Sequence, residues 1–229
     1  MSATNDQPAG RAVLWDLDGT LIDSMGYHWQ AWRDSLAPSG IDLSYERFSH
    51  SSGLRNNEVI RLFFGPDMPL AAGQRIGAAK ELRYQELVRT RGLALLPGVE
   101  HWLKQIKAAG WRQAMASAAP RANIEVVTEV LDLARYFEAI VSADDVQRGK
   151  PDPQIFLLAA QRLGVRPEHC LVIEDAPAGV EGARRAGMRS IGVLATCSQL
   201  EADIVVSSLE DLPFERLEQL FSVLPITPS

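Results

Sequence analysis

The chain has 229 residues, of which 46% are hydrophobic and 23% are charged. These proportions are typical of an ordinary globular protein, and they exclude a wholly disordered chain, a coiled coil and a collagen. The formal net charge of −6 argues against a broad surface for nucleic acid. The length predicts one domain with an insertion, or a large and a small domain.

The sequence shows no pattern of export or of membrane insertion. The first ten residues have no basic start followed by an apolar stretch, so no signal peptide is expected. No apolar run approaches the ~20 residues that a helix needs to span a bilayer. Cys170 and Cys197 are too few for a disulfide framework. We expect a cytoplasmic protein that binds neither nucleic acid nor a membrane, with a monomer as the default state.

The first part of the chain predicts one strand and then a helical segment. Residues 12–15 form a short apolar run that leads into Asp16 and is stopped by the turn dipeptide Asp18-Gly19, as expected of a buried strand. Residues 24–92 carry few strand signals, and their apolar residues recur at helical spacing. We therefore predict a helical insertion at 24–92, directly after the first strand.

Beyond residue 97, short apolar runs alternate with helical patterns. The further predicted strands are 113–117, 139–141, 170–173, 190–193 and 204–206. The predicted helices are 99–106, 124–133, 155–163, 176–186 and 214–221. Strands that are apolar throughout and alternate with helices are typical of a parallel sheet with helices on both faces. The predicted fold class is therefore α/β, with a core of residues 1–23 and 93–229.

Side chains that can carry chemistry follow four of these strands. They are Asp16 and Asp18, Ser117, Lys150, and Glu174 with Asp175. Ligands of an open parallel sheet bind beyond the carboxyl ends of its strands, so these side chains are expected at one edge. Four carboxylates there repel one another unless a hard cation such as Mg²⁺ lies among them. Because Mg²⁺ and a lysine together suit the oxygens of a phosphoryl group, we predict a phosphoryl-transfer site.

The two aspartates after the first strand suit a division of labour. Asp16 could attack phosphorus and form an aspartyl-phosphate. Asp18 lies two residues further on, which in an extended chain returns to the same side. It could protonate the leaving oxygen and then deprotonate the incoming water. The pair therefore indicates an enzyme that passes through a covalent intermediate.

Four segments of the chain resemble, in order and spacing, the four motifs of the haloacid dehalogenase superfamily of aspartyl-phosphate phosphatases. They are Asp16–Ser24, Ala114–Ser117, Gly149–Pro153 and Val172–Val180. The resemblance implies a Rossmann-like core with a four-helix cap domain inserted at 24–92. Within the superfamily the chain is most similar to sugar-phosphate phosphatases and β-phosphoglucomutases. The implied activity is Mg²⁺-dependent hydrolysis of a small phosphorylated metabolite, above all a sugar phosphate.

The resemblance also implies roles for the matching core residues. Asp16 is the expected nucleophile, and Asp18 is the expected general acid and base. The Asp16 side chain, the Asp18 main-chain carbonyl and Asp175 are expected to hold Mg²⁺. Glu174 would lie in or next to the coordination shell of that ion.

Contacts to the substrate follow from the same resemblance. Ser117 and Lys150 are expected to hold the transferring phosphoryl group. The cap positions expected to bind the rest of the substrate are His28, Gly53, Arg55 and Lys80. The motifs do not specify which phosphorylated metabolite is the physiological substrate.

Two alternatives to a phosphatase stay open. β-Phosphoglucomutases carry Arg where this chain has Asn56, and Ser-Lys where it has Ala119-Pro120, and those residues grip the second phosphate of their substrate. Their absence favours transfer of the phosphoryl group to water, with a β-phosphoglucomutase as the alternative. A phosphosugar-binding protein without turnover is disfavoured by the Asp16/Asp18 pair, because binding alone needs no acid–base residue.

Overall fold

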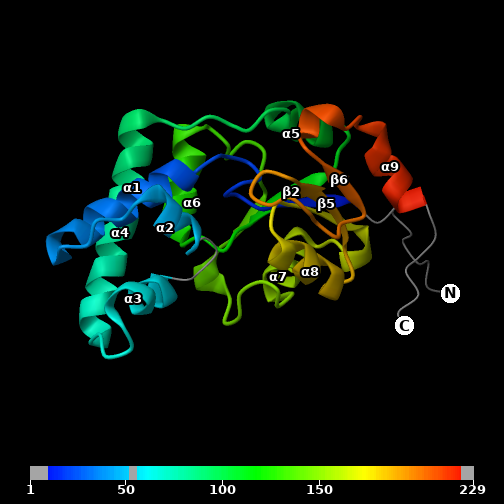
Figure 1. Ribbon diagram of the computed structural model, residues 1–229. Helices are drawn as coiled ribbons and strands as arrows, with labels where there is room; N and C mark the ends of the chain where they lie inside the picture. Colours follow the sequence, from blue (N-terminus) through cyan, green and yellow to red (C-terminus); the bar gives the residue numbers. More distant parts are fainter. Residues whose placement is uncertain (1–9, 52–55, 223–229) are drawn as a thin grey trace. The chain divides into compact units, whose positions relative to one another are not determined.

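The computed structural model describes residues 10–51 and 56–222, and a six-stranded parallel sheet forms its core (Figure 1). The strands follow the spatial order β3-β2-β1-β4-β5-β6. They are β1 (Ala12–Trp15), β2 (Arg112–Ala116), β3 (Ala139–Val141), β4 (Cys170–Glu174), β5 (Arg189–Val193) and β6 (Ile204–Val206). The predicted α/β fold class is confirmed.

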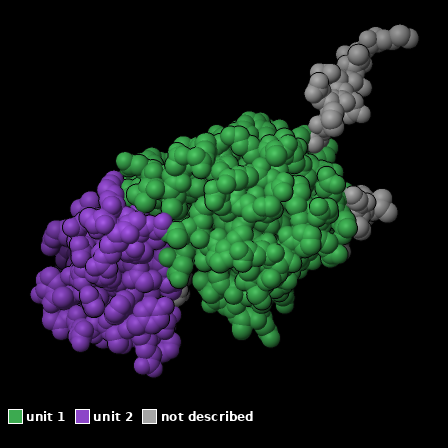
Figure 2. Space-filling model, turned by 90° about the horizontal axis from the view of Figure 1, so that it is seen from above, with its two compact units in different colours: residues 1–23, 94–229 green, residues 24–93 purple. Residues whose placement is uncertain are grey.

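The chain divides into two compact units, one of residues 1–23 and 94–229 and one of residues 24–93 (Figure 2). Besides the sheet, the first unit contains α5 (Val99–Ala108), α6 (Arg121–Val130), α7 (Gln154–Leu163), α8 (Pro177–Arg185) and α9 (Glu215–Ser222). The second unit contains α1 (Met25–Leu36), α2 (Tyr45–Ser49), α3 (Asn56–Phe64) and α4 (Leu70–Arg91). Within residues 10–51 and 56–222, no helix combines the length and apolar character that a membrane crossing requires.

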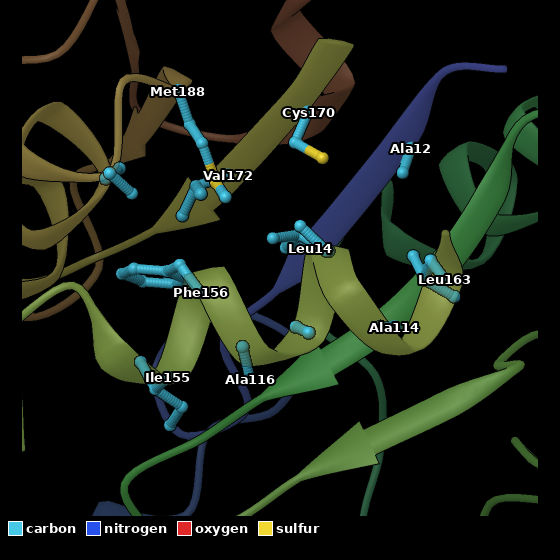
Figure 3. Packing of buried hydrophobic residues seen from close by; sticks show 14 of the residues in the cluster. Ala12, Leu14, Ala114, Ala116, Ile155, Phe156, Leu163, Cys170, Val172 and Met188 are labelled. Carbon is cyan, nitrogen blue, oxygen red and sulfur yellow. The ribbon is translucent and has the colours of Figure 1, made fainter. Parts of the chain in front are cut away.

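Helices α7 and α8 cover one face of the sheet. Leu14 of β1 and Val172 of β4 point to this face and share a buried cluster with Phe156 of α7 and Ala183 of α8 (Figure 3). Full burial of a side chain such as Phe156 contributes roughly 1.5–3 kcal/mol to folding. Because β1 and β4 are buried along their whole length, their sequences are continuous apolar runs, up to Glu174 at the end of β4, and do not alternate with polar residues.

The opposite face is covered by α5 and α6. Trp15 Nε1 donates a hydrogen bond to Gln113 Oε1 at 3.0 Å, and Gln113 Nε2 donates to the Leu103 carbonyl of α5 at 3.1 Å. The hydroxyl of Thr128 in α6 lies 4.0 Å from the sulfur of Met115 in β2. The buried amide of Gln113 is tolerated because both of its ends have partners.

Helix α6 lies earlier in the chain than the sequence pattern predicts. We predicted residues 124–133, whereas the helix spans Arg121–Val130. Pro120 directly precedes it, and the fixed φ of proline suits the start of a helix. Asp132 has a φ of 51°, a left-handed conformation that a continuing helix cannot contain. The apolar spacing extends to Leu133 because that residue is buried beyond the turn.

The helices of the second unit surround a hydrophobic cluster of their own. Its buried members come from α1, from the α1–α2 connection, and from α2 and α3. They are Trp32, Leu36, Leu43, Phe48, Val59 and Ile60. The helical spacing of apolar residues thus corresponds to an inner face in α1 and α3, but not at every position, because Leu62 of α3 and Leu82 of α4 are exposed.

Asp145 joins the end of β3 to α6 and α7. Its carboxylate accepts hydrogen bonds from the backbone N–H of Ser142 at 2.8 Å, from Arg121 at 2.7 Å and from Arg162 at 2.6 Å. Burial acts to raise the pKa of this carboxyl, but the hydrogen bonds outweigh it and hold the pKa well below its usual range. A carboxyl with a lowered pKa stabilises the fold above its usual pKa of about 3.9, and this stability is lost as the pH falls through the folded value.

Asp145→Asn is expected to lower the free energy of unfolding by about 2 kcal/mol at neutral pH, because a neutral amide cannot accept from both arginines. Urea unfolding measures the change. Asp132→Asn is the matched control, since the ion pair of Asp132 with Arg135 lies at the surface and contributes little. The difference in the free energy of unfolding between wild type and Asp145→Asn should become smaller below about pH 4. Equal unfolding midpoints for the two variants would contradict the role of Asp145.

Candidate active site

The pairing of β1 with β4 brings three carboxylates together. Trp15 pairs with Ile173 in the sheet, and the Asp16 N–H donates to the Ile173 carbonyl at 3.0 Å. Asp16 directly follows β1, Glu174 ends β4, and Asp175 comes next. One oxygen from each of these three carboxylates lies within 4.8 Å of the others, and all three residues are buried. The carboxyl ends of two neighbouring strands therefore form one acidic cluster.

Lys150 forms ion pairs with this cluster. Its Nζ lies 2.6 Å from Asp16 Oδ1 and 2.5 Å from Glu174 Oε1. The lysine side chain is only 8% exposed, and its Nζ lies 5.2 Å from the centre of the Phe156 ring in α7. We call Asp16, Lys150, Glu174 and Asp175 the carboxylate–lysine centre. A charge this deeply buried needs such partners, because desolvation is otherwise too costly.

The electrostatics of the carboxylate–lysine centre are unbalanced. Burial raises the pKa of Asp16 well above its usual range; Lys150 opposes the shift, and Glu174 and Asp175 add to it. Burial and the charge of Glu174 raise the pKa of Asp175 to about 6. Burial acts to lower the pKa of Lys150, but Asp16 and Glu174 outweigh it and the pKa is raised. Three carboxylates share one ammonium group, so a further cation would offset the surplus negative charge.

Glu174 is fixed by the loop that leads into α8. Its Oε2 accepts the backbone N–H groups of Asp175 at 2.9 Å and of Ala176 at 2.8 Å. Gly179 lies in the first turn of α8, and a Cβ at this position would overlap the Glu174 carboxylate. The missing side chain of Gly179 thus makes room for a carboxylate at the start of a helix, where negative charge is favourable.

Asp18 and Ser117 lie beyond the ends of β1 and β2. Asp18 is half-buried in a turn that is closed by a hydrogen bond from the Gly19 N–H to the Ile22 carbonyl at 2.8 Å. Ser117 is buried, and its Oγ accepts the backbone N–H of Ala119 at 3.0 Å. Asp18 and Ser117 thus each lie just beyond the carboxyl end of a strand, as Asp16 does.

Of the four cap positions predicted to bind substrate, the structure describes His28 and Lys80. Gly53 and Arg55 lie outside the described residues. The His28 ring stacks on the ring of Tyr84, with 4.2 Å between the centroids and 7° between the planes. His28 therefore belongs to an aromatic pair within the second unit.

Lys80 is buried, and the neighbouring residue Glu81 supplies the opposite charge. Its Nζ lies 3.1 Å from Glu81 Oε1 and 5.6 Å from the centre of the Trp32 ring. Asn56 Nδ2 donates a hydrogen bond to the same Glu81 oxygen at 2.7 Å. Glu81 thus offsets the charge of Lys80 and also engages the amide of Asn56.

Two threonines that the sequence analysis did not single out contact Asp175. Thr20 Oγ1 donates to Asp175 Oδ1 at 3.3 Å, and Thr196 Oγ1 donates to Asp175 Oδ2. Thr20 lies inside the first motif, so its position in the sequence is a usable signal. Thr196 lies 21 residues after Asp175, in a segment without a motif, and no sequence pattern points to it.

Comparison with known proteins identifies relatives of the whole chain. Residues 11–187 match the family of haloacid dehalogenase-like hydrolases. A β-phosphoglucomutase of Bacillus subtilis is 35% identical, with 91% of this chain and 94% of the relative covered. Hexitol phosphatase B of Escherichia coli is 34% identical, with coverage of 90% and 96%. Among solved structures, a β-phosphoglucomutase from Clostridium difficile has a TM-score of 0.80 at 30% identity, with 93% and 97% covered.

The family match extends from just before β1 to just beyond α8, and it includes every residue of the carboxylate–lysine centre. The two curated relatives are about one-third identical in sequence to this chain, and each alignment covers nearly all of it. Their names indicate phosphoryl chemistry on sugars and sugar alcohols. The chain is a member of the haloacid dehalogenase-like hydrolase family, and its relatives include sugar phosphatases and β-phosphoglucomutases.

Proposed function

We propose that the protein is a Mg²⁺-dependent phosphatase that hydrolyses a small phosphomonoester, a sugar phosphate, through an aspartyl-phosphate on Asp16. The carboxylate–lysine centre carries this proposal: a buried aspartate at the tip of a strand lies against a lysine and two further carboxylates. Such an arrangement supplies a nucleophile and the charges that a phosphoryl group requires. The relationship to a hexitol phosphatase supports the class of substrate.

The donor set of the centre fits Mg²⁺. Oxygens of Asp16, Glu174 and Asp175 lie within 4.8 Å of one another, and Mg²⁺ prefers oxygen ligands with few protein carboxylates. Asp16, Asp175 and the main-chain carbonyl of Asp18 would hold the ion. Glu174 would lie in or next to the coordination shell. When bound there, Mg²⁺ would stabilise negative charge on the phosphoryl oxygens.

Asp16 and Asp18 would carry the two chemical steps. In the first, an Asp16 carboxylate oxygen bonds to phosphorus, the bond from phosphorus to the sugar oxygen breaks, and Asp18 gives its proton to that oxygen. In the second, water bonds to phosphorus and Asp18 takes its proton. The bond between phosphorus and Asp16 breaks, inorganic phosphate leaves, and both residues return to their starting state.

The other predicted residues would bind rather than react. Lys150 is buried beside Asp16, where its ammonium group can hold the oxygens of the transferring phosphoryl group. Ser117 directly follows the neighbouring strand β2 and would donate its hydroxyl to the same group. In the cap, His28 and Lys80 would contact the sugar part of the substrate.

A β-phosphoglucomutase is the second candidate, and the relative from Bacillus subtilis favours it. A mutase must hold a second phosphate in turn, for which cationic side chains are needed. Here Asn56 replaces the arginine of the mutases, and both Asn56 and Lys80 are engaged by Glu81, at 2.7 Å and 3.1 Å. Only Arg55 and Lys80 remain as candidate cations for a second phosphate, and Glu81 already offsets the charge of Lys80, which favours hydrolysis.

Phosphate release from a panel of sugar phosphates is expected to require Mg²⁺, because the carboxylates of the centre otherwise repel the substrate. Excess EDTA should abolish the release, and added Mg²⁺ should restore it. Asp175→Ala is expected to raise the Mg²⁺ concentration for half-maximal activity by roughly 10-fold or more, while Asp211→Ala, outside the centre, should leave it unchanged. Full activity in excess EDTA would rule out the proposed metal dependence.

β-Glucose 1-phosphate distinguishes the two candidate functions. For a phosphatase we expect inorganic phosphate without glucose 6-phosphate, and no stimulation by glucose 1,6-bisphosphate, because Asn56, Ala119 and Pro120 supply no cation where the mutases have Arg and Lys. A coupled assay for glucose 6-phosphate and a colorimetric assay for phosphate follow both products in one sample. If isomerisation outpaces phosphate release, the protein is a mutase.

A further inference from the structure

The loop after β5 lies against Asp175. Strands β4 and β5 pair so that Glu174 is opposite Gly192, which brings the residues after β5 beside those after β4. Thr196 Oγ1 donates to Asp175 Oδ2 and lies 3.2 Å from the Asp175 carbonyl. Cys197 Sγ lies 3.3 Å from the same carbonyl. One short loop therefore contacts both the carboxylate and the backbone of Asp175.

A second segment fixes the other side of the carboxylate. Thr20 Oγ1 donates to Asp175 Oδ1 at 3.3 Å, so each carboxylate oxygen accepts one hydroxyl. Gly19 adopts a φ of 89° and packs closely against Asp175. A Cβ at this position would overlap Asp175 Oδ2 and would approach Thr196 Cγ2 to 2.9 Å. Asp175 is thus confined between the first motif and the loop after β5.

The loop itself is held to the sheet. The Leu194 N–H donates to the Val206 carbonyl at 2.9 Å, and the Ala195 N–H donates to the Val193 carbonyl at 2.9 Å. Thr196 follows directly, so its hydroxyl is presented by an anchored backbone. The torsion that rotates a carboxylate has broad minima, so the rotation of Asp175 is set by its hydrogen-bond donors.

We propose that Thr196 is a positioning residue that holds the Asp175 carboxylate in the orientation that binds the divalent cation. The inference rests on the proposed function, because it assigns Asp175 to Mg²⁺. Each carboxylate oxygen has two lone pairs and can accept a hydroxyl while it also binds an ion. Hydrogen-bond partners of metal-binding carboxylates typically change metal affinity by 10- to 100-fold when they are removed.

Calorimetric titration of the full-length, substrate-free protein with MgCl₂ tests the role of Thr196. Thr196→Val keeps the shape and removes the hydroxyl, and it is expected to raise the Kd for Mg²⁺ on the order of 10-fold. Thr196→Ser restores a hydroxyl and should bind within about threefold of wild type. With Mg²⁺ saturating, kcat of Thr196→Val should stay close to wild type, because the residue touches no reacting atom.

Thr128→Val is the matched control. Thr128→Val makes the same chemical change elsewhere: Thr128 is buried whereas Thr196 is exposed, and the Thr128 hydroxyl donates to the Ile124 carbonyl of α6 at 2.7 Å, outside the carboxylate–lysine centre. This variant should bind Mg²⁺ as wild type does. If Thr196→Val fails to fold in a thermal melt with EDTA, Thr196→Ala removes the hydroxyl without adding bulk and is expected to give the same loss of affinity.

The outcomes separate this inference from the proposed function. If wild type binds Mg²⁺ and releases phosphate but the variants without the hydroxyl bind Mg²⁺ equally well, the positioning role of Thr196 is wrong and the phosphatase proposal stands. An equal loss for Thr196→Ser and Thr196→Val also overturns the role, because the hydroxyl is then not responsible. If wild type neither binds Mg²⁺ nor releases phosphate, both proposals fail together.

Discussion

Replacing Asp16 with asparagine is expected to lower the turnover of phosphate release by at least ~10³-fold, on the order of the loss of a catalytic nucleophile. Asparagine keeps the size of the side chain, but its neutral amide is a poor nucleophile towards phosphorus. Steady-state phosphate release from the best substrate of the panel measures the effect. Retention of more than a tenth of wild-type activity would show that Asp16 is not the nucleophile.

Two controls sharpen the Asp16→Asn experiment. Asp132→Asn makes the same chemical change at an exposed position where the backbone has a φ of 51°, which asparagine adopts readily, and it should keep full activity. Acid-quenched wild type should carry covalent phosphate that hydroxylamine releases, as expected of an acyl phosphate. Asp16→Asn should carry none, which ties the lost activity to the lost covalent intermediate.

Asp18→Asn is expected to lower kcat by about 10²- to 10⁴-fold with little change in KM, because general acid catalysis contributes at that level and the role that we propose for Asp18 is proton transfer, not substrate binding. A sugar alkoxide leaves poorly without a proton, whereas an activated aryl oxide needs little assistance. The loss should therefore be larger for a sugar phosphate than for p-nitrophenyl phosphate.

The comparison of the two substrates decides the role of Asp18. Steady-state kinetics on both give kcat and KM for wild type, Asp18→Asn and the control Asp132→Asn. Equal losses on both substrates would argue against proton transfer to the leaving oxygen. A rise in KM with unchanged kcat would instead indicate that Asp18 binds the substrate.

The apolar runs of the sequence predicted the sheet because strands buried on both faces have little other choice of residues. The predicted bounds of β1, β3 and β6 agree with the structure, and those of β2, β4 and β5 agree to within one residue at each end. The predicted bounds of α6 lie three residues too late in the chain. Periodicity indicates which side chains are buried, but it does not indicate the left-handed turn at Asp132.

The gathering of site residues also followed from a simple rule. In a parallel sheet the carboxyl ends of neighbouring strands meet, so Asp16, Glu174 and Asp175 were expected together although about 160 residues separate the first from the others. The structure brings these three together with Lys150. Their roles in catalysis and metal binding stay predictions until the variants are measured.

Contacts that depend on close packing were beyond the sequence. The offset of Lys80 by Glu81 and the hydroxyl of Thr196 on Asp175 involve no motif, and although Glu174 and Gly179 both lie in the fourth motif, the sequence does not show that the glycine makes room for the carboxylate. Strand composition and motif order reflect requirements that every member of a fold must meet, and so they can be read residue by residue. Which side chain fills the space beside a carboxylate depends on segments folded against each other, and only the three-dimensional arrangement decides it.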